Sequence, residues 1–206
     1  LDRSSAASDV YKRQGLDGLY IPHDDEYQNE YLPACYERLA WATGFTGSAG
    51  AAFVFQKSAI VFVDGRYTLQ VKQQLAPKLF DVGDLVDPGA FGWLAKQTLT
   101  GQKIGYDPRL MSPDALDKLT EAAAKAGATL VVVDPNPIDT AWTDRPSEPT
   151  QAVVPHDVAY AGESSSSKRA RLGRALAEQK IDAAVITSPA SIALSLIHIS
   201  EPTRPY

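Results

Sequence analysis

An aspartate and an arginine are separated by one glycine at Asp64-Gly65-Arg66, directly after the apolar run Ala59–Val63. A guanidinium group stays charged and offers forked donors for carboxylate or carbonyl oxygens. In open α/β sheets, ligands bind beyond the carboxyl ends of the strands, where we expect Arg66 to lie. The same arginine could instead pair with a neighbouring acid and hold the turn. The spacing alone leaves both roles open.

Three consecutive carboxylates, Asp24-Asp25-Glu26, follow His23 and could together bind a hard cation. Consecutive side chains in a loop diverge, however, and no second carboxylate cluster completes a ligand set. We therefore interpret this segment as a solvated acidic loop, with His23 and His156 structural or exposed. No motif typical of nucleophilic or metal-dependent catalysis occurs elsewhere, so we predict no catalytic residue and no metal-binding residue in this chain.

The glycine-rich segment 44–50 lacks the spacing of a phosphate-binding loop, and a strand pattern rather than a helix follows it. We expect it to let backbone approach backbone closely. The segment Trp142-Thr143-Asp144-Arg145-Pro146 combines an aromatic ring, a charge pair and a proline, so we expect it to pin a linker onto a domain face. Cys35 is the only cysteine, which predicts a buried, inert thiol and no disulfide.

The composition argues against several kinds of partner. The net charge of the chain is −5, whereas nucleic-acid-binding surfaces are usually basic, so we expect no nucleic acid. No run approaches the ~20 apolar residues of a membrane span, so we expect no membrane partner. The lone cysteine fits a reducing, cytoplasmic setting.

Both ends of the sequence look foreign to the protein. Residues 4–14 and 194–204 correspond, codon by codon, to in-frame readings of the two arms of a transposon-type sequencing adapter. We therefore interpret residues 1–14 and 194–206 as adapter-derived segments that do not belong to the fold. The native part is then 15–193, and we expect neither of its ends to be a true terminus.

Strand and helix patterns alternate over residues 15–136. Apolar, β-branched runs predict strands over 16–21, 51–55, 59–63, 79–82, 103–106 and 129–133. Helical spacing predicts helices over 67–75, 90–99 and 113–126. Ser112 is a good N-cap for the last of these helices, and Gly127 ends it. The alternation predicts an α/β domain with a mixed sheet flanked by helices, in which 51–63 supplies an antiparallel hairpin.

The composition of the sequence changes after residue 136. Prolines and serines dominate 137–167, which we interpret as a connection, with prolines preventing regular structure from 135 onward. A helix over 168–179 and a strand over 181–187 then open a second, similar α/β domain, truncated at 193. Because this opening lacks the strands that would cover it, Ile181, Val185 and Ile186 should be more exposed than Leu19 and Ile21.

Five segments together resemble the amino-terminal region of Xaa-Pro aminopeptidases, the aminopeptidase P members of the creatinase/prolidase-like metallopeptidases. Residues 27–32 resemble the family's HQSEY segment, although Tyr27 stands where the family has His and Asn29 where it has Ser. Residues 37–50 resemble ERxxxxSGFxGSAG, and 64–70 match DGRYxxQ. Residues 104–108 match IGxDP, and 138–146 match xVDxxWxDRP. Their order and spacing also agree with the family.

The resemblance implies a full-length enzyme that removes the amino-terminal residue from peptides with proline in second position. It implies a dinuclear site, typically manganese, whose Asp, Asp, His, Glu and Glu ligands lie in a domain beyond Ala193. This chain would then hold no cofactor and would be inactive alone. The resemblance further implies that the amino-terminal domains form a homodimer and wall the substrate cleft, and that Arg66 binds the peptide.

Two other readings of the resemblance remain. Some proteins with this fold have lost the metal ligands and bind peptides or histones without catalysis, so a non-catalytic binding module is the alternative. A prolidase or a creatinase is a third possibility, but the WxDRP match at 142–146 favours aminopeptidase P. The sequence beyond Ala193 would distinguish the aminopeptidase from the non-catalytic binding module.

Overall fold

The computed structural model describes residues 15–152, 154 and 156–196 of the 206-residue chain. The two segments interpreted as adapter-derived lie outside these residues, except for 194–196. The chain divides into two compact units between Glu148 and Pro149. Within the described residues, no helix is long and apolar enough to cross a bilayer.

The first unit is built on a six-stranded mixed sheet with the strand order β4-β3-β2-β1-β5-β6. The strands are β1 (Gly18–Pro22), β2 (Gly50–Phe55), β3 (Ala59–Val63), β4 (Asp81–Asp84), β5 (Lys103–Tyr106) and β6 (Thr129–Val132). β2 is antiparallel to its neighbours, and the β1–β5, β5–β6 and β3–β4 pairs are parallel. Five strands therefore end on the same side of the sheet, which we call the carboxyl rim. The expected α/β architecture with a mixed sheet is confirmed.

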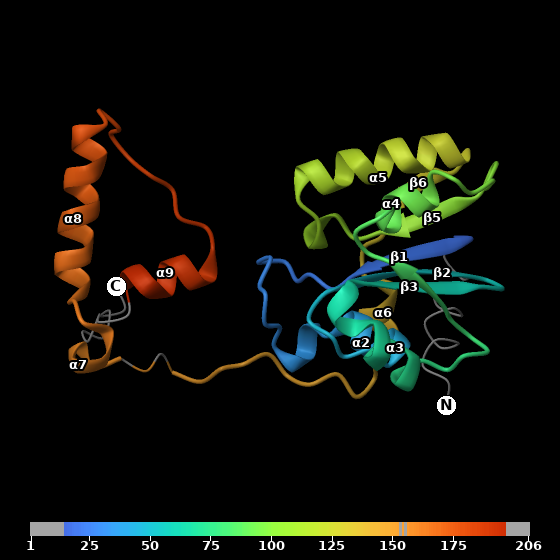
Figure 1. Cartoon of the computed structure of the whole chain (residues 1–206), viewed down its shortest axis with the longest axis horizontal. Coiled ribbons are helices and arrows are strands. Elements are labelled where there is room, and N and C mark those ends of the chain that lie inside the picture. The colour runs from blue at the N-terminus through green and yellow to red at the C-terminus, as the bar shows by residue number, and fades with distance from the viewer. Residues whose placement is uncertain (1–14, 153, 155, 197–206) are drawn as a thin grey trace. The chain divides into compact units, whose positions relative to one another are not determined.

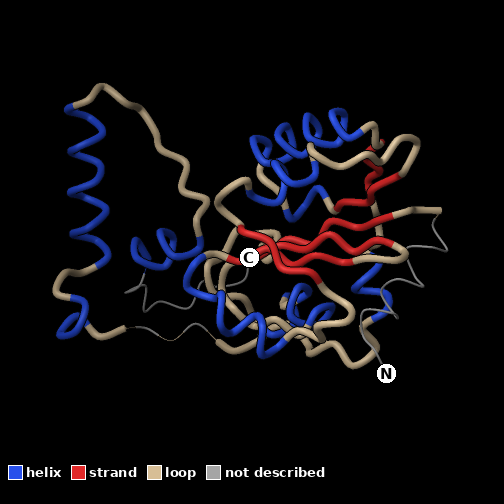
Figure 2. The backbone as a smooth tube through the Cα atoms, turned by 45° about the vertical axis from the view of Figure 1, so that its right-hand side comes forward, coloured by secondary structure: helices blue, strands red, loops and turns tan. Residues whose placement is uncertain are grey.

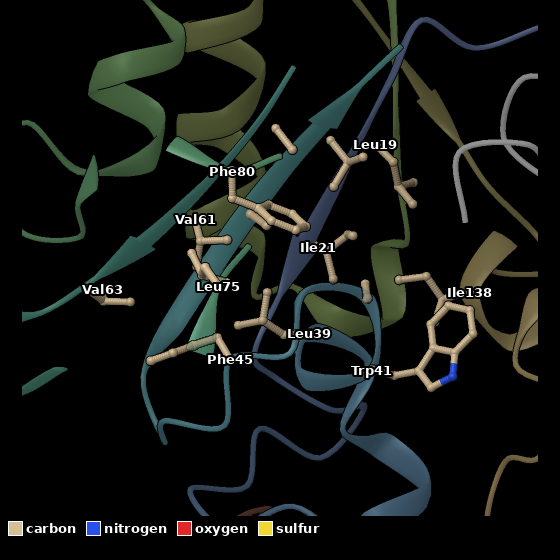
Figure 3. Packing of buried hydrophobic residues seen from close by; sticks show 14 of the residues in the cluster. Leu19, Ile21, Leu39, Trp41, Phe45, Val61, Val63, Leu75, Phe80 and Ile138 are labelled. Atoms are coloured by element: carbon tan, nitrogen blue, oxygen red, sulfur yellow. The ribbon is translucent and has the colours of Figure 1, made fainter. Parts of the chain in front are cut away.

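Helices cover both faces of this sheet (Figures 1 and 2). One face packs against α2 (Arg38–Thr43), α3 (Thr68–Gln74) and α6 (Pro137–Ala141), and the other against α4 (Gly89–Leu94) and α5 (Pro113–Ala126). Figure 3 shows Leu39 and Trp41 of α2, together with Ile21 of the sheet, in the hydrophobic core on the α2, α3 and α6 side of the sheet. Because both faces are covered, β1 and β3 are apolar at every position rather than alternating.

Local signals set the helix ends. The Ser112 side chain accepts a hydrogen bond from the backbone N–H of Ala115, and Gly127 ends α5 with a left-handed φ of 76°. Three short 3₁₀ helices, η1 (Ala34–Tyr36), η2 (Gly65–Tyr67) and η3 (Pro108–Leu110), complete the described part of the first unit. η2 and η3 both begin where a strand of the carboxyl rim ends.

The expectation that prolines prevent regular structure from residue 135 onward is wrong at α6. Pro137 occupies the first turn of this helix, where its missing N–H costs nothing and its fixed φ is favourable. The Asn136 side chain caps the helix by accepting a hydrogen bond from the Ile138 N–H at 3.0 Å. Trp142 then stacks on Trp41, with ring centroids 5.7 Å apart. Residues 137–142 are therefore part of the first unit's core.

The second unit contains α7 (Val158–Ala161), α8 (Ser165–Glu178) and α9 (Pro189–Leu196). The predicted helix over 168–179 is confirmed, but the predicted strand over 181–187 is wrong. A strand needs a hydrogen-bonded neighbouring strand, and among the described residues this segment has none. The expected exposure is confirmed. Ile181, Val185 and Ile186 are 43%, 89% and 39% exposed, whereas Leu19 and Ile21 are each 2% exposed.

Candidate functional site

Arg66 lies on the carboxyl rim, in the turn that follows β3. The Asp64 carboxylate accepts the backbone N–H of Arg66 at 2.9 Å and the Nη2 of its guanidinium at 2.7 Å. The guanidinium Nε also lies 3.1–3.2 Å from both carboxylate oxygens. The Arg66 side chain is nevertheless 64% exposed. The pairing with a neighbouring acid is therefore present, and it leaves the guanidinium accessible to a ligand.

Tyr67 joins this turn to the glycine-rich segment. Its hydroxyl lies 2.8 Å from the Ser48 hydroxyl, and its ring centroid lies 5.2 Å from the Arg66 guanidinium carbon. The hydrogen bond with Ser48, aided by the Arg66 charge, lowers the pKa of Tyr67. A side chain at Gly47 would collide with the rings of Phe45 and Tyr67. At Gly50 a Cβ would lie 3.0 Å from the backbone oxygen of Phe62, so the expected approach of backbone to backbone is confirmed there, whereas Gly47 makes room for side-chain rings.

A second turn of the same form follows β5. The Asp107 carboxylate accepts the Arg109 backbone N–H at 3.0 Å, its Nε at 3.1 Å and its Nη2 at 2.9 Å. It also accepts the side-chain amide of Asn136 at 3.0 Å. Burial raises the pKa of the Asp107 carboxyl, but the hydrogen bonds from Arg109 and Asn136 outweigh burial, so its pKa is lowered.

The interpretation of Asp24-Asp25-Glu26 as a solvated acidic loop is wrong. Asp25 is fully buried. Its carboxylate accepts hydrogen bonds from the backbone N–H groups of Tyr27 and Asn29, both at 3.0 Å, and from the Asn29 side-chain amide at 2.7 Å, and these bonds compensate for its burial. These bonds satisfy backbone groups that a tight loop would otherwise leave unpaired. Burial raises the pKa of the half-buried Asp24.

A charged network behind this loop was not identified from the sequence. Arg38 is 2% exposed and forms a two-pronged ion pair with Asp139, at 2.7 and 3.0 Å, and a third contact with Glu26 at 3.0 Å. Arg145 also pairs with Asp139, at 3.1 Å, and its Nε donates to the backbone carbonyl of Cys35 at 2.6 Å. The charged residues of segments 37–50 and 138–146 are visible in the sequence, but the sequence does not show which of them pair with one another.

Two expectations about this region are confirmed. Arg145 and Trp142 pin segment 142–146 onto the first unit. Cys35 is a buried, free thiol. His23 is also buried, at 9% exposure.

The implied dinuclear manganese site does not fit this part of the protein. Over the described residues, no group of three or more His, Cys, Asp or Glu side chains is arranged to hold a metal ion. Glu26 is already paired with Arg38, and Asp25 with loop donors.

Two cavities open on the described part of the first unit. One, of about 390 Å³, lies beside the β2–β3 turn and is lined by residues that include Phe55, Lys57 and Trp93. The other, of about 410 Å³, lies between α4 and α5. Arg66 lines neither of these two cavities, and its side chain is largely exposed at the carboxyl rim.

Comparison with known proteins gives matches to two family profiles. Residues 3–141 match the creatinase/prolidase N-terminal domain, and residues 144–196 match a second profile with the same description. The first match begins inside the segment interpreted as adapter-derived.

Similar proteins are aminopeptidases. The chain is 38% identical to Aminopeptidase P2 of Arabidopsis thaliana over 177 residues, covering 84% of this chain and 25% of that protein. It is 34% identical to a probable Xaa-Pro aminopeptidase P of Arthroderma otae over 189 residues, covering 90% of this chain and 30% of that protein. The chain therefore spans under a third of the length of these relatives.

Solved structures give the same fold. The X-prolyl aminopeptidase of Caenorhabditis elegans, described as a cytosolic enzyme with a di-nuclear active site, superposes with a TM-score of 0.75 at 31% identity, over 88% of this chain and 30% of that chain. The N-terminal domain of the cytoplasmic peptidase PepQ from Mycobacterium tuberculosis superposes with a TM-score of 0.52 at 21% identity, over 68% of this chain and 97% of that chain. The second likeness concerns the fold alone.

Proposed function

Because the chain belongs to the creatinase/prolidase N-terminal domain family, we propose that it is the non-catalytic amino-terminal portion of an Xaa-Pro aminopeptidase. In this proposal the whole enzyme removes the first residue from peptides whose second residue is proline. The relatives of which the chain covers 25–30% support this, because they carry that enzyme's name or a related one.

The exposure and the position of the Arg66 side chain support a substrate-binding role for this residue. Its guanidinium is largely exposed at the carboxyl rim, where open α/β sheets usually bind their ligands. The hydrogen bonds with Asp64 hold the side chain in one orientation without burying it. A preoriented guanidinium loses less conformational entropy on binding a peptide oxygen than a free one. Arg66 therefore binds and orients the peptide, and it takes no part in bond cleavage.

The remaining roles follow from the same proposal. The metal site, typically dinuclear manganese in this family, belongs to a catalytic domain outside the described residues. The metal would activate water and polarise the scissile carbonyl there. The amino-terminal units would form a homodimer and a wall of the cleft. The whole enzyme would act in the cytoplasm, the setting given for the Caenorhabditis elegans relative.

The gene beyond the codon for Ala193 tests the proposal. We expect it to encode a further domain with an Asp, Asp, His, Glu, Glu ligand set. A continuation that keeps the domain but has lost these ligands would instead support the non-catalytic peptide- or histone-binding module. A continuation unrelated to either would contradict both.

A further inference from the structure

Arg66 and Arg109 are presented by two turns of the same form. Each turn begins with an aspartate at the end of a parallel strand, and each arginine donates its backbone N–H and its guanidinium to that aspartate. In both turns the side-chain bonds use Nε and Nη2, so Nη1 has no partner among the described residues. The Arg109 side chain is 50% exposed.

The strand order fixes the separation of the two turns. β3 and β5 are three strand spacings apart in the sheet, which at ~4.8 Å per spacing is ~14 Å. An extended peptide advances ~3.4 Å per residue, so ~14 Å corresponds to about four residues. An extended peptide that spans the two turns must therefore be longer than a tripeptide.

One loop runs between the two arginines. Within the segment that leaves the rim after β1, Glu30 is close enough to interact electrostatically with Arg66, and Glu26 with Arg109. The same loop exposes the rings of Tyr27 and Tyr31, at 61% and 80%. Tyrosine and arginine are enriched at binding surfaces because they offer large contact area together with polar groups.

We propose that Arg109 is a second peptide-binding residue, which donates a hydrogen bond from Nη1 to a backbone carbonyl about four residues along the peptide from the group held by Arg66. This assignment rests on the proposed function, in which Arg66 binds the peptide. A carbonyl fits Arg109 better than a terminal carboxylate does, because Asp134 and Glu26 already place negative charge nearby. The site would therefore favour peptides of about six residues over tripeptides.

Nuclear magnetic resonance of the arginine side chains tests this on the unaltered 206-residue chain. The probes are an Ala-Pro-Ala tripeptide and an Ala-Pro-Ala-Ala-Ala-Ala hexapeptide, both with amidated carboxyl ends. We expect the tripeptide to shift the Nε–Hε signal of Arg66 alone, and the hexapeptide to shift the signals of both Arg66 and Arg109. A hexapeptide that shifts Arg66 but not Arg109 would overturn this inference and leave the proposed function standing. No shift at Arg66 with either peptide would contradict the proposed function itself.

Variants give an independent measurement. Arg109→Gln should raise the Kd of the hexapeptide about tenfold, the size expected for losing one hydrogen bond to a charged group at a partly exposed site. The Kd of the tripeptide should change less than twofold. Arg174→Gln removes the same charge from exposed α8 in the second unit and should change neither Kd. Equal effects of Arg109→Gln on both peptides would assign Arg109 a general electrostatic or folding role and overturn the inference.

Discussion

Arg38 and Asp139 form a buried, two-pronged ion pair across 101 residues of sequence, with Nε–Oδ1 and Nη2–Oδ2 distances of 2.7 and 3.0 Å. The pair fastens α2 to α6, and it does so next to the stacked rings of Trp41 and Trp142. It therefore holds the last helix of the first unit on the sheet.

Removing Arg38 should destabilise the first unit. Arg38→Leu leaves the Glu26 carboxylate without its ion-pair partner and Asp139 with Arg145 alone. Removing one partner of such a buried pair costs about 3 kcal/mol of unfolding free energy. Urea unfolding followed by tryptophan fluorescence measures this. Lys118→Ala removes an exposed ion pair with Asp114 and should cost no more than about 0.5 kcal/mol. Equal effects of the two changes would show that the Arg38 network does not stabilise the fold.

Asp107 should make stability depend on pH in the acid range. Its pKa is lowered in the folded state, so its contribution is present above the unfolded-state pKa of about 3.9 and is lost as the pH falls through the folded-state pKa. Asp107→Asn should cost about 1–3 kcal/mol at pH 7, because one of its buried donors loses its acceptor. Unfolding measured from pH 7 to pH 2.5 should show a smaller acid loss in the variant. Parallel pH profiles would contradict this.

Asp24 should change the pH dependence of stability in the opposite direction to Asp107. Burial raises its pKa in the folded state, and Asp25 raises it further, although His23 and a backbone hydrogen bond lower it. Its contribution is therefore fully present below the unfolded-state pKa and is lost as the pH rises through the folded-state pKa. Asp24→Asn should raise the melting temperature at pH 7 and have less effect near pH 3. A lower melting temperature at pH 7 would refute the assignment.

Limited proteolysis should leave a resistant core that begins near Gly15 and ends near Glu148. Trp142 and Arg145 are packed or bonded to the core, whereas residues 147–152 are exposed and without regular structure. Exposed irregular segments are the preferred sites of cleavage. Mass spectrometry of the fragments locates the ends. A core that ends near residue 136 would mean that α6 does not stay packed in solution.

The sequence predicted best those helices and strands whose ends are set by residues close by in the chain. α5 lies between its N-cap Ser112 and Gly127 as expected, and β3 and β5 match their predicted ranges. The predicted helix over 90–99 is confirmed only as far as Leu94, and the predicted strand over 79–82 is displaced to Asp81–Asp84.

Features that depend on distant residues were not predicted. Proline was interpreted as a helix breaker at 137, although Asn136 followed by Pro137 is the same local cap pattern as Ser112 followed by Pro113. Only the packing of α6 on the sheet depends on distant residues. The burial of Asp25 and the pairing of Arg38 with Asp139 depend on folded geometry in the same way. For Arg66, the spacing indicated both pairing with Asp64 and a place at a strand end, and the structure shows both.

Arg66 carries the central claim, that this unit binds the peptide for an enzyme whose chemistry lies elsewhere. In the full-length protein, Arg66→Ala should barely change the melting temperature, because the Asp64–Arg66 pair is a surface turn contact. Arg66→Lys keeps the charge but loses the fork, so it should not restore function.

The most direct measurement is kcat/KM for an Xaa-Pro peptide with manganese, compared between the full-length protein and its Arg66→Ala variant. We expect kcat/KM to fall on the order of 10- to 100-fold, as for the loss of a hydrogen bond to a charged group, while the variant remains folded. Arg174→Gln should leave it unchanged. A variant that unfolds while its surviving folded fraction keeps full specific activity would contradict the account, because Arg66 would then hold the turn and not the peptide.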